Sequence, residues 1–312
     1  MRPTYIEGDY TISPAFENQS RLVYGLGGIG GIWGTVKEGE SIDAILYALE
    51  NGISVFDTAP SYGDSESFFG KALKQWVGAK PFISTKVGRL RGKNAFDYNL
   101  DFSSEGIKRS LQNSLETIGV DSIDLLFLHE PHLVPLENMG VILETLSYFK
   151  EQGLVKQLGV GGNPSKDFMP FVKRENFDVV SGFLHLNACN LSAFNGEIQM
   201  YKREGMLYYA ASPLHFGLLG NRLDSYNKNG VDGKWITEKD LQNAVAVKEI
   251  ADENEIPLPT LAHRYLFSVN EADRIVIGAK NLQEIQSSII DWQSGKLTKK
   301  LFNQITDTIC EA

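Results

Sequence analysis

Residues 123–129 read Ile-Asp-Leu-Leu-Phe-Leu-His, a short run in which apolar side chains would face both sides of a β-strand. Residues 274–278, Arg-Ile-Val-Ile-Gly, have the same two-sided apolar character. Strands of this kind are typical of parallel sheets that are covered on both faces. These two stretches therefore predict an α/β protein with a buried parallel sheet.

Other segments with the composition of strands alternate with amphipathic segments along the chain. We predict strands at residues 22–26, 54–57, 82–86, 123–129, 156–160, 179–183, 207–211 and 275–278. We predict helices at residues 41–51, with Ser41 as the N-cap, and at 103–118, 137–151 and 240–253. Eight units of this kind in 312 residues fit a closed (β/α)8 TIM barrel better than an open sheet.

Nothing in the sequence divides the chain into two domains. It contains no Pro/Ser-rich linker and no internal repeat, so residues 1–312 are predicted to form a single barrel domain. Residues 1–20 are expected to lie outside the barrel as an N-terminal extension. The polar segment 221–237 is expected to be a long loop or an insertion.

The composition argues against several classes of protein. The 39 acidic and 30 basic residues give a formal charge of −9, which repels phosphate backbones and disfavours a nucleic-acid partner. Two cysteines, Cys189 and Cys310, do not make a disulfide framework. No apolar run reaches the roughly 18 residues needed to span a bilayer, and residues 1–20 do not resemble a signal peptide. We expect a soluble cytoplasmic protein without a membrane partner, as a monomer or a homodimer.

A glycine-rich motif follows the first predicted strand. Residues 25–30, Gly-Leu-Gly-Gly-Ile-Gly, match the G-x-G-x-x-G pattern of Rossmann dinucleotide-binding domains, in which Asp57 would bind a ribose. That fingerprint requires a helix to begin at the last glycine. The chain instead continues Gly-Ile-Trp-Gly-Thr, and helical periodicity begins only near Ser41. We therefore favour a glycine-rich loop between a strand and a helix over a Rossmann site.

Polar residues end three consecutive predicted strands. These are Asp57, Lys86 and His129, and Tyr62 follows the first of them by one short loop. Active sites of (β/α)8 barrels lie at the carboxyl-terminal ends of the strands, so these four side chains are expected to converge. Each of them alone could equally have a structural role.

Together the four side chains predict a proton-transfer unit at a C–O bond. The pKa of a free tyrosine is about 10, and a lysine cation beside Tyr62 would lower it. Asp57 would keep Lys86 charged, and His129 would hydrogen-bond the substrate oxygen. No serine or cysteine stands beside the histidine at these strand ends, so a nucleophile–base pair is not expected. We expect no metal at His129 and His132, because the sequence lacks H-E-x-x-H and a carboxylate cluster.

Three motifs resemble the signatures of the aldo-keto reductase superfamily. They are Phe-Asp-Thr-Ala-Pro-Ser-Tyr-Gly at 56–63, Ser-Thr-Lys-Val-Gly at 84–88 and Leu-His-Glu-Pro-His at 128–132. The resemblance implies a barrel oxidoreductase that binds NAD(P)(H) without a Rossmann domain. It also implies that Tyr62 is the general acid/base, that Lys86 and Asp57 tune it, and that His129 orients the carbonyl or hydroxyl group.

Further stretches are similar to the aldose 1-dehydrogenase branch, which includes D-threo-aldose (L-fucose) and L-galactose dehydrogenases and pyridoxal 4-dehydrogenase. They are residues 84–90, the Phe-Asp-Tyr triplet at 96–98 and residues 105–132. Residues 211–219, Ala-Ser-Pro-Leu-His-Phe-Gly-Leu-Leu, are similar to the corresponding loop of L-galactose dehydrogenase.

The resemblance also implies where the cofactor lies. It puts Gly162, Asn163 and Asn187 near the nicotinamide carboxamide and Ser212 and Leu214 along the pyrophosphate, while Ala211 stands where many reductases have a stacking tyrosine. Gly278, Lys280 and Glu284 follow the last strand. NADP-preferring relatives usually carry a basic residue at the position of Glu284, and a carboxylate there repels a 2′-phosphate. We therefore favour NAD, while Lys280 keeps NADP open and Glu284 could be only a solvated helix residue.

These inferences predict an oxidoreductase that oxidises the anomeric carbon of a free aldose of the galactose, fucose or arabinose type to the lactone. Aromatic and polar residues of the predicted loops are candidates for sugar contacts: Trp33, Phe96, Tyr98, His132 and Phe216. One alternative is an NADPH-dependent carbonyl or aldehyde reductase, including one for pyridoxal-type or modified-sugar substrates. Another is a redox-sensing regulatory subunit, as some superfamily members are for potassium channels.

Overall fold

The strand β6 (Ile123–His129) is one of eight parallel strands that close into a barrel in the computed structural model, which describes residues 2–12 and 19–311. The order around the barrel is β1-β10-β9-β8-β7-β6-β3-β2. The other barrel strands are β1 (Leu22–Gly25), β2 (Val55–Asp57), β3 (Phe82–Val87), β7 (Val155–Gly161), β8 (Val179–Phe183), β9 (Leu207–Ala211) and β10 (Arg274–Gly278). The predicted (β/α)8 barrel is confirmed.

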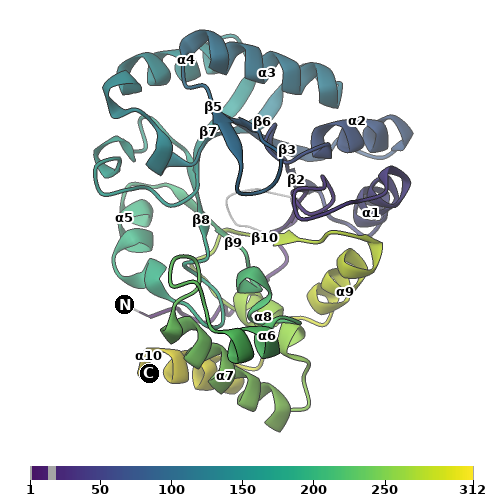
Figure 1. The fold of residues 1–312 in the computed structure, drawn as a ribbon, viewed down its shortest axis with the longest axis vertical. Coiled ribbons are helices and arrows are strands. Elements are labelled where there is room, and N and C mark those ends of the chain that lie inside the picture. The colour runs from purple at the N-terminus through teal and green to yellow at the C-terminus, as the bar shows by residue number, and fades with distance from the viewer. Residues whose placement is uncertain (1, 13–18, 312) are drawn as a thin grey trace.

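Helices surround the strands on the outside of the barrel (Figure 1). They are α1 (Glu38–Glu50), α2 (Ser65–Gln75), α3 (Ser104–Ile118), α4 (Met139–Glu151), α5 (Glu197–Arg203), α6 (Leu223–Asn229), α7 (Glu238–Glu253), α8 (Leu258–Phe267), α9 (Leu282–Gln293) and α10 (Lys299–Glu311). Helix α3 shows why such segments fold locally, because Ser103 caps its start by accepting a hydrogen bond from the Gly106 amide at 3.0 Å. None of the helices within the described ranges has the length and apolar character that crossing a bilayer requires.

Some elements differ from the sequence-based expectation. Ser41 is not an N-cap: α1 begins at Glu38, and the Ser41 hydroxyl instead donates to the Ile29 carbonyl at 3.0 Å. The first turn of α1 is polar, so apolar periodicity could not reveal it. The segment 221–237 contains the helix α6, and a hairpin of β4 (Arg89–Arg91) and β5 (Tyr98–Leu100) follows β3. Residues 13–18 of the expected N-terminal extension lie outside the described residues.

Side chains alternate between the inside of the barrel and the helices. One buried cluster fills the interior, and its members are Val23, Val55, Phe82, Leu125, Phe127, Val179 and Tyr209. Counting in twos from these positions, and reading across to β7 and β10 from the strand register, identifies the inward-facing residues at the carboxyl-terminal ends of the strands, which we call the mouth. They are Gly25, Asp57, Lys86, His129, Gly161, Phe183, Ala211 and Gly278. The period of two therefore brings Asp57, Lys86 and His129 to one end of the barrel.

The glycine-rich motif at 25–30 is a loop, because α1 begins only at Glu38. Its last glycine lies against the loop that carries Tyr62. A Cβ atom added at Gly30 would lie 1.8 Å from the Tyr62 carbonyl oxygen, and the Asp64 amide donates to the Gly30 carbonyl at 2.9 Å. The motif therefore permits close backbone packing behind Tyr62, which a side chain at Gly30 would prevent.

We expect Gly30→Ala to displace Tyr62, because its methyl group overlaps a backbone atom that cannot rotate away. Displacement of a reacting group by about 1 Å costs on the order of 100-fold in rate, so kcat/KM should fall by about that factor. Gly39→Ala is the matched control, because a Cβ at Gly39 meets no atom within 4 Å and the residue lies in α1. Equal kcat/KM in the two variants would contradict this packing role.

Candidate active site

The mouth holds a buried ion pair between two neighbouring strands. The Lys86 ammonium donates to both carboxylate oxygens of Asp57, at 2.7 and 2.6 Å, and to the Thr58 carbonyl at 2.9 Å. The Ser84 hydroxyl adds a fourth contact, donating to Asp57 Oδ1 at 2.7 Å. Asp57 and Lys86 are both buried, and a hydrogen bond with Tyr62 adds to these contacts of Lys86. The position of the Lys86 cation is therefore fixed.

Tyr62 lies between this ion pair and His129. The Lys86 Nζ atom is 4.7 Å from the centroid of the Tyr62 ring, and the Tyr62 and His129 ring centroids are 5.7 Å apart in an edge-on arrangement. His129 is buried and Tyr62 is half-buried. The four residues expected to converge do so, although their catalytic roles stay a prediction.

The electrostatics of Tyr62 differ from the simple expectation. Burial raises its pKa above the ordinary value, and Asp57 and Glu130 raise it further, while Lys86 acts in the opposite direction. The net shift is upward because the phenolate would lose solvation. Lys86 also has a raised pKa: burial lowers it, but the charge of Asp57 and the neighbouring Tyr62 more than offset burial. The resting site thus combines a protonated phenol with a lysine cation.

His129 is held in its neutral form. Burial lowers its pKa well below the ordinary value, and the cations Lys86 and Arg89 add to that shift. Its Nδ1 atom lies 3.4 Å from the hydroxyl of Ser61, a buried residue of the loop that carries Tyr62. Ser61 and Ser84 were not predicted. Strand alternation could have indicated Ser84, which stands two residues before Lys86.

The other half of the mouth carries small residues. Gly25, Gly161, Ala211 and Gly278 end β1, β7, β9 and β10. A Cβ atom added at Gly278 would meet no atom within 4 Å, so the space beside β10 is open. A cofactor ring beside the four polar residues needs such space, and the residues present fit it.

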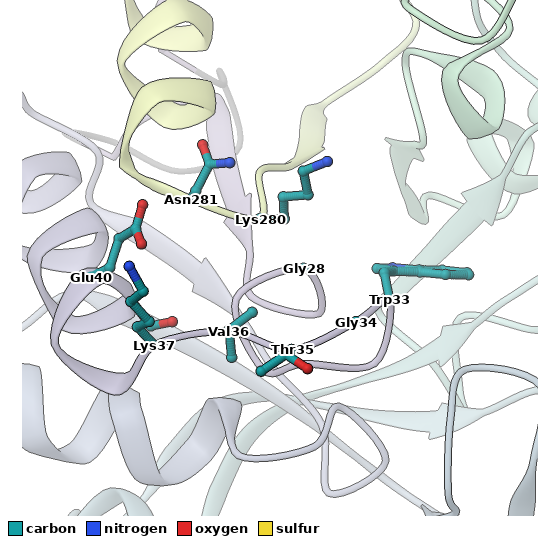
Figure 2. Close-up of a pocket in the computed structure, with 10 residues that line it drawn as sticks. Gly28, Trp33, Gly34, Thr35, Val36, Lys37, Glu40, Lys280 and Asn281 are labelled. Carbon is teal, nitrogen blue, oxygen red and sulfur yellow. The ribbon is translucent and has the colours of Figure 1, made fainter.

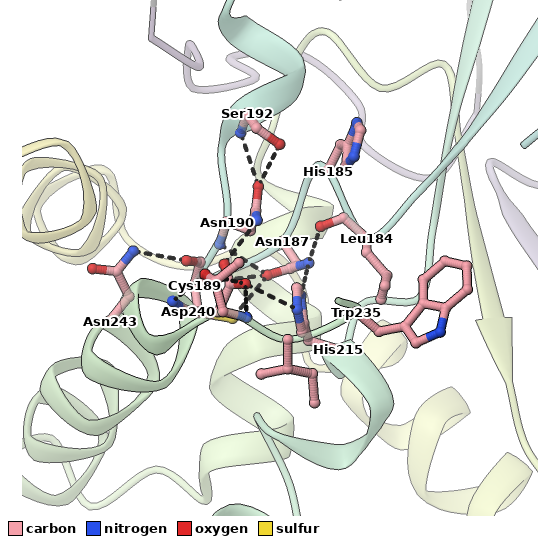
Figure 3. A network of polar contacts seen from close by, with 12 residues as sticks. Leu184, His185, Asn187, Cys189, Asn190, Ser192, His215, Trp235, Asp240 and Asn243 are labelled. Atoms are coloured by element: carbon pink, nitrogen blue, oxygen red, sulfur yellow. Dashed lines mark hydrogen bonds and ion pairs between the residues drawn. The ribbon is translucent and has the colours of Figure 1, made fainter. Parts of the chain in front are cut away.

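Two asparagines predicted near the carboxamide are engaged within the protein. Asn187 is fully buried: its Nδ2 donates to the Leu184 carbonyl and contacts His215 Nδ1, both at 2.9 Å, as drawn in Figure 3. Its Oδ1 accepts from the amides of Cys189 and Asn190 at 3.0 Å. The structure therefore puts Asn187 in a supporting network and not at the mouth. It lies four residues beyond β8, where strand alternation no longer predicts direction.

Asn163 connects the ends of two strands. Its Nδ2 donates to the Phe183 carbonyl at 2.7 Å and its Oδ1 accepts from the Phe183 amide at 2.9 Å. The preceding Gly162 has a φ of +123°, and its amide donates to the Ser181 carbonyl at 3.0 Å. These contacts fix the backbone beside the mouth, where Gly162 and Asn163 are half-buried.

The loop after β9 holds an unusual backbone. Ser212, His215 and Phe216 have φ values of 65°, 46° and 54°, a region that costs free energy for residues other than glycine. Buried His215 anchors this loop, because its Nδ1 contacts Asn187 and its Nε2 lies 3.7 Å from Asp240 Oδ2 of α7 (Figure 3). The predicted cofactor residues Ser212 and Leu214 are half-buried in the same loop.

The turn between β10 and α9 carries Lys280 and Glu284. The Glu284 carboxylate accepts from the Lys280 amide at 3.0 Å and lies 3.3 Å from the Lys280 ammonium. Asn281 caps α9 by accepting from the Glu284 amide at 2.9 Å. A cavity of about 200 Å³ is lined by this turn and by the β1–α1 loop, including Gly28 and Trp33 (Figure 2).

Three of the five predicted substrate residues belong to a continuous set of aromatic contacts, which we call the aromatic chain. It joins Trp33 to Phe96 at 5.6 Å and to Phe216 at 5.8 Å, measured between ring centroids. Phe183 and Trp235 extend it, with centroids 5.4 and 6.3 Å from Phe216. Phe183 and Trp235 were not predicted, although alternation in β8 indicates that Phe183 faces inward.

The other two predicted substrate residues belong to a polar group. The Arg89 Nη1 atom donates to Glu130 Oε1 at 2.9 Å, and the Arg89 guanidinium lies 4.9 Å from the Tyr98 ring centroid. His132 Nδ1 lies 3.5 Å from Glu130 Oε2. Arg89 and Glu130 were not predicted, because an ion pair between residues that are 41 positions apart leaves no recognisable pattern in the sequence.

The chain matches known proteins along most of its length. The model of the Aldo/keto reductase family matches residues 21–309. L-galactose dehydrogenase of Arabidopsis thaliana is 28% identical over 306 residues, covering 88% of this chain and 94% of the relative. D-arabinose 1-dehydrogenase of Saccharomyces cerevisiae is 30% identical over 276 residues, covering 82% and 78%. NADH-specific methylglyoxal reductase of Escherichia coli is 24% identical over 294 residues, covering 86% and 89%.

Solved structures share the fold. A glycerol dehydrogenase from Gluconobacter oxydans superposes with a TM-score of 0.77 at 23% identity, covering 96% of this chain and 94% of that one. At this identity the likeness speaks for the fold alone, whereas the family match extends over nearly the whole barrel. The chain belongs to the aldo/keto reductase family of oxidoreductases, which use nicotinamide cofactors.

Proposed function

We propose that this protein oxidises the anomeric carbon of a free aldose of the galactose, fucose or arabinose type to the lactone, with NAD as the favoured cofactor. The observation that carries the proposal is the arrangement of Tyr62 between the Lys86–Asp57 ion pair and His129. The substrate class is supported by the similarity to an L-galactose dehydrogenase and a D-arabinose 1-dehydrogenase.

The protein's part in this reaction is to move one proton. The deprotonated form of Tyr62 takes the proton of the anomeric hydroxyl, and Lys86, 4.7 Å from the Tyr62 ring centroid, stabilises this phenolate before the transfer. A neutral imidazole carries one N–H, and in the tautomer that we assign to His129 the Ser61 hydroxyl, 3.4 Å away, donates to Nδ1. The His129 proton then belongs on Nε2, which donates to the substrate oxygen.

The small residues of the mouth support a nicotinamide cofactor beside Tyr62. When bound, the nicotinamide accepts the hydrogen and the two electrons that leave the anomeric carbon. Gly278, beside which a Cβ would meet no atom within 4 Å, and the small side chain of Ala211 leave room for the ring, and the loop with Ser212 and Leu214 would hold the phosphates. Asn187 is omitted from this set because its amide is engaged elsewhere.

The turn before α9 supports NAD over NADP. Glu284 pairs with Lys280, so the one cation predicted to receive a 2′-phosphate is already neutralised by a carboxylate. A phosphate placed there would meet the negative charge of Glu284, while ribose hydroxyls could donate to it.

A second candidate is reduction of an aldehyde, and one observation favours it. The raised pKa of Tyr62 leaves the phenol protonated at neutral pH, which suits donation of a proton to a carbonyl oxygen. The similarity to an NADH-specific methylglyoxal reductase of Escherichia coli points the same way.

Tyr62→Phe tests the proton transfer. Loss of the phenol hydroxyl should lower kcat for aldose oxidation by about 100- to 10,000-fold, the usual contribution of a general acid or base. The Kd of NADH, measured by protein fluorescence, should change less than about twofold because the ring remains. Tyr148→Phe, at an exposed tyrosine of α4, is the control. Equal turnover by Tyr62→Phe and the wild type would exclude Tyr62 as the acid/base.

The two directions of the reaction should respond differently to pH. Oxidation needs the deprotonated form of Tyr62, whose pKa burial raises above about 10, so kcat should climb from about pH 7 to about pH 10. Aldehyde reduction by NADH uses the protonated phenol and should stay flat over that range. An oxidation rate that falls above neutral pH in initial-rate profiles would contradict this assignment.

Glu284→Gln tests cofactor choice. Removing the carboxylate frees Lys280 and removes about 1.4 kcal/mol of repulsion, so the NADP/NAD ratio of kcat/KM should rise about tenfold. Gln283→Glu is the matched control, because it adds a carboxylate at the exposed neighbouring position. If Glu284→Gln leaves the ratio unchanged, Glu284 does not set cofactor choice.

A further inference from the structure

Glu130 is a carboxylate held at the mouth by residues that do not belong to the four-residue group. It directly follows His129, and its backbone has a φ of 56°, which turns the chain at the end of β6. Its amide donates to the Gly161 carbonyl at 2.8 Å, so the turn is tied to the end of β7. Glu130 therefore stands directly after His129 and beside the glycines that end and follow β7.

Arg89 fixes the direction of the Glu130 side chain. Its Nη1 donates to Glu130 Oε1 at 2.9 Å, its Nη2 donates to the Ala95 carbonyl at 2.6 Å, and its guanidinium lies 4.9 Å from the Tyr98 ring centroid. The Arg89 side chain is only 12% exposed. The β4–β5 hairpin therefore clamps the arginine, and the arginine holds one oxygen of Glu130.

The second oxygen of Glu130 has capacity to accept hydrogen bonds. Among the described residues, Oε2 has a 3.5 Å contact with His132 Nδ1, and it would lie 3.4 Å from a Cβ atom at Gly162. The side chain is 24% exposed, so Oε2 is not sealed from solvent. A carboxylate accepts about four hydrogen bonds, and Arg89 occupies one of these positions.

The chemistry of the pair selects the kind of ligand. Arg89 and Glu130 neutralise each other, so the pair has no net charge that would attract a carboxylate or phosphate. A neutral hydroxyl can donate to Glu130 Oε2 without changing the charge of the site. Tyr98, against Arg89, presents a half-exposed ring that suits the C–H face of a sugar.

We infer that Glu130, positioned by Arg89, binds the hydroxyl on the carbon next to the reacting carbon and so makes the enzyme select 2-hydroxylated substrates. The inference rests on the proposed function. It names the neighbouring hydroxyl because Glu130 adjoins His129, which binds the reacting oxygen, and that hydroxyl is the next polar group along the substrate. Arg89 is a positioning residue in this arrangement.

The test compares an aldose with its 2-deoxy analogue in the wild type and in Glu130→Gln. A site built to bind a hydroxyl discriminates strongly against its absence, so wild-type kcat/KM should favour the aldose by about 10- to 100-fold. Glu130→Gln keeps an oxygen for Arg89 but removes the charge. In this variant the ratio of kcat/KM for the aldose to kcat/KM for the 2-deoxy analogue should fall to within about threefold of one. The fall should come from a lower kcat/KM for the aldose, while the value for the 2-deoxy analogue stays unchanged.

Glu137→Gln is the matched control, since it removes an exposed carboxylate from the same β6–α4 connection and should keep the wild-type ratio. Thermal melting of each variant shows whether it is folded, and Glu130→Ala provides a second variant if Glu130→Gln is not. An unchanged ratio in a folded variant, or equal loss on both sugars, would overturn the role of Glu130 while leaving the aldose dehydrogenase intact.

Failure of the proposed function would give a different result from failure of the role of Glu130. If the wild type oxidises neither sugar but reduces aldehydes with NADH, the same comparison is made between 2-hydroxypropanal and propanal. A preference of about tenfold for the hydroxyaldehyde that collapses in Glu130→Gln supports the role of Glu130 in a reductase. The absence of that preference, or its persistence in the variant, overturns it.

Discussion

The buried ion pair of Lys86 and Asp57 is the constraint around which the mouth of the barrel is organised. Two charges in a protein interior are stable together only when their remaining hydrogen-bonding positions are filled, and removing one partner typically costs about 3–5 kcal/mol. Ser84 and the Thr58 carbonyl fill such positions here. Because the pair joins neighbouring strands β2 and β3, its geometry is as rigid as the barrel itself.

The rigid strands and the loops contribute different groups to the site. Strand ends provide the groups that act on the reacting oxygen, and loops provide the groups that surround the rest of a ligand. The aromatic chain joins the end of β8 to the segments after β1, β3 and β9, and the Arg89–Glu130 pair joins β4 to the turn after β6. The strained backbone at His215 and Phe216 is stabilised by the contacts of the His215 ring with Asn187 and Asp240.

Much of the barrel could be predicted from the sequence, for a physical reason. Strands buried on both faces leave uninterrupted apolar runs, so 123–129, 179–183 and 207–211 match β6, β8 and β9 to the residue. The β4–β5 hairpin is largely solvent-exposed and left no such run. The start of α1 was missed because Glu38 and Glu40 stabilise its first turn through the helix dipole and not through apolar packing.

Some residues of the site could likewise be predicted from the sequence, and others could not. Asp57, Lys86 and His129 could be identified because the end of a strand is readable in sequence. The partners that support them could not, since Ser61 reaches His129 and Arg89 reaches Glu130 across loops that are distant along the chain. The internal contacts of Asn187 could not be predicted for a related reason: it lies beyond β8, where position along the chain no longer determines which way a side chain points.

Closure of the barrel by the first and last strands has a consequence for synthesis of the protein. The residues proposed to move the proton leave the ribosome early, but β1 pairs with β10, and Gly28 of the first loop lies against Ala279 beyond the last strand. Contacts between such distant segments form late in folding. A nascent or truncated chain that ends before β10 would carry the whole proton-transfer group and still lack the turn that faces the cofactor. Activity therefore requires that synthesis has passed β10 and that the first and last strands have paired.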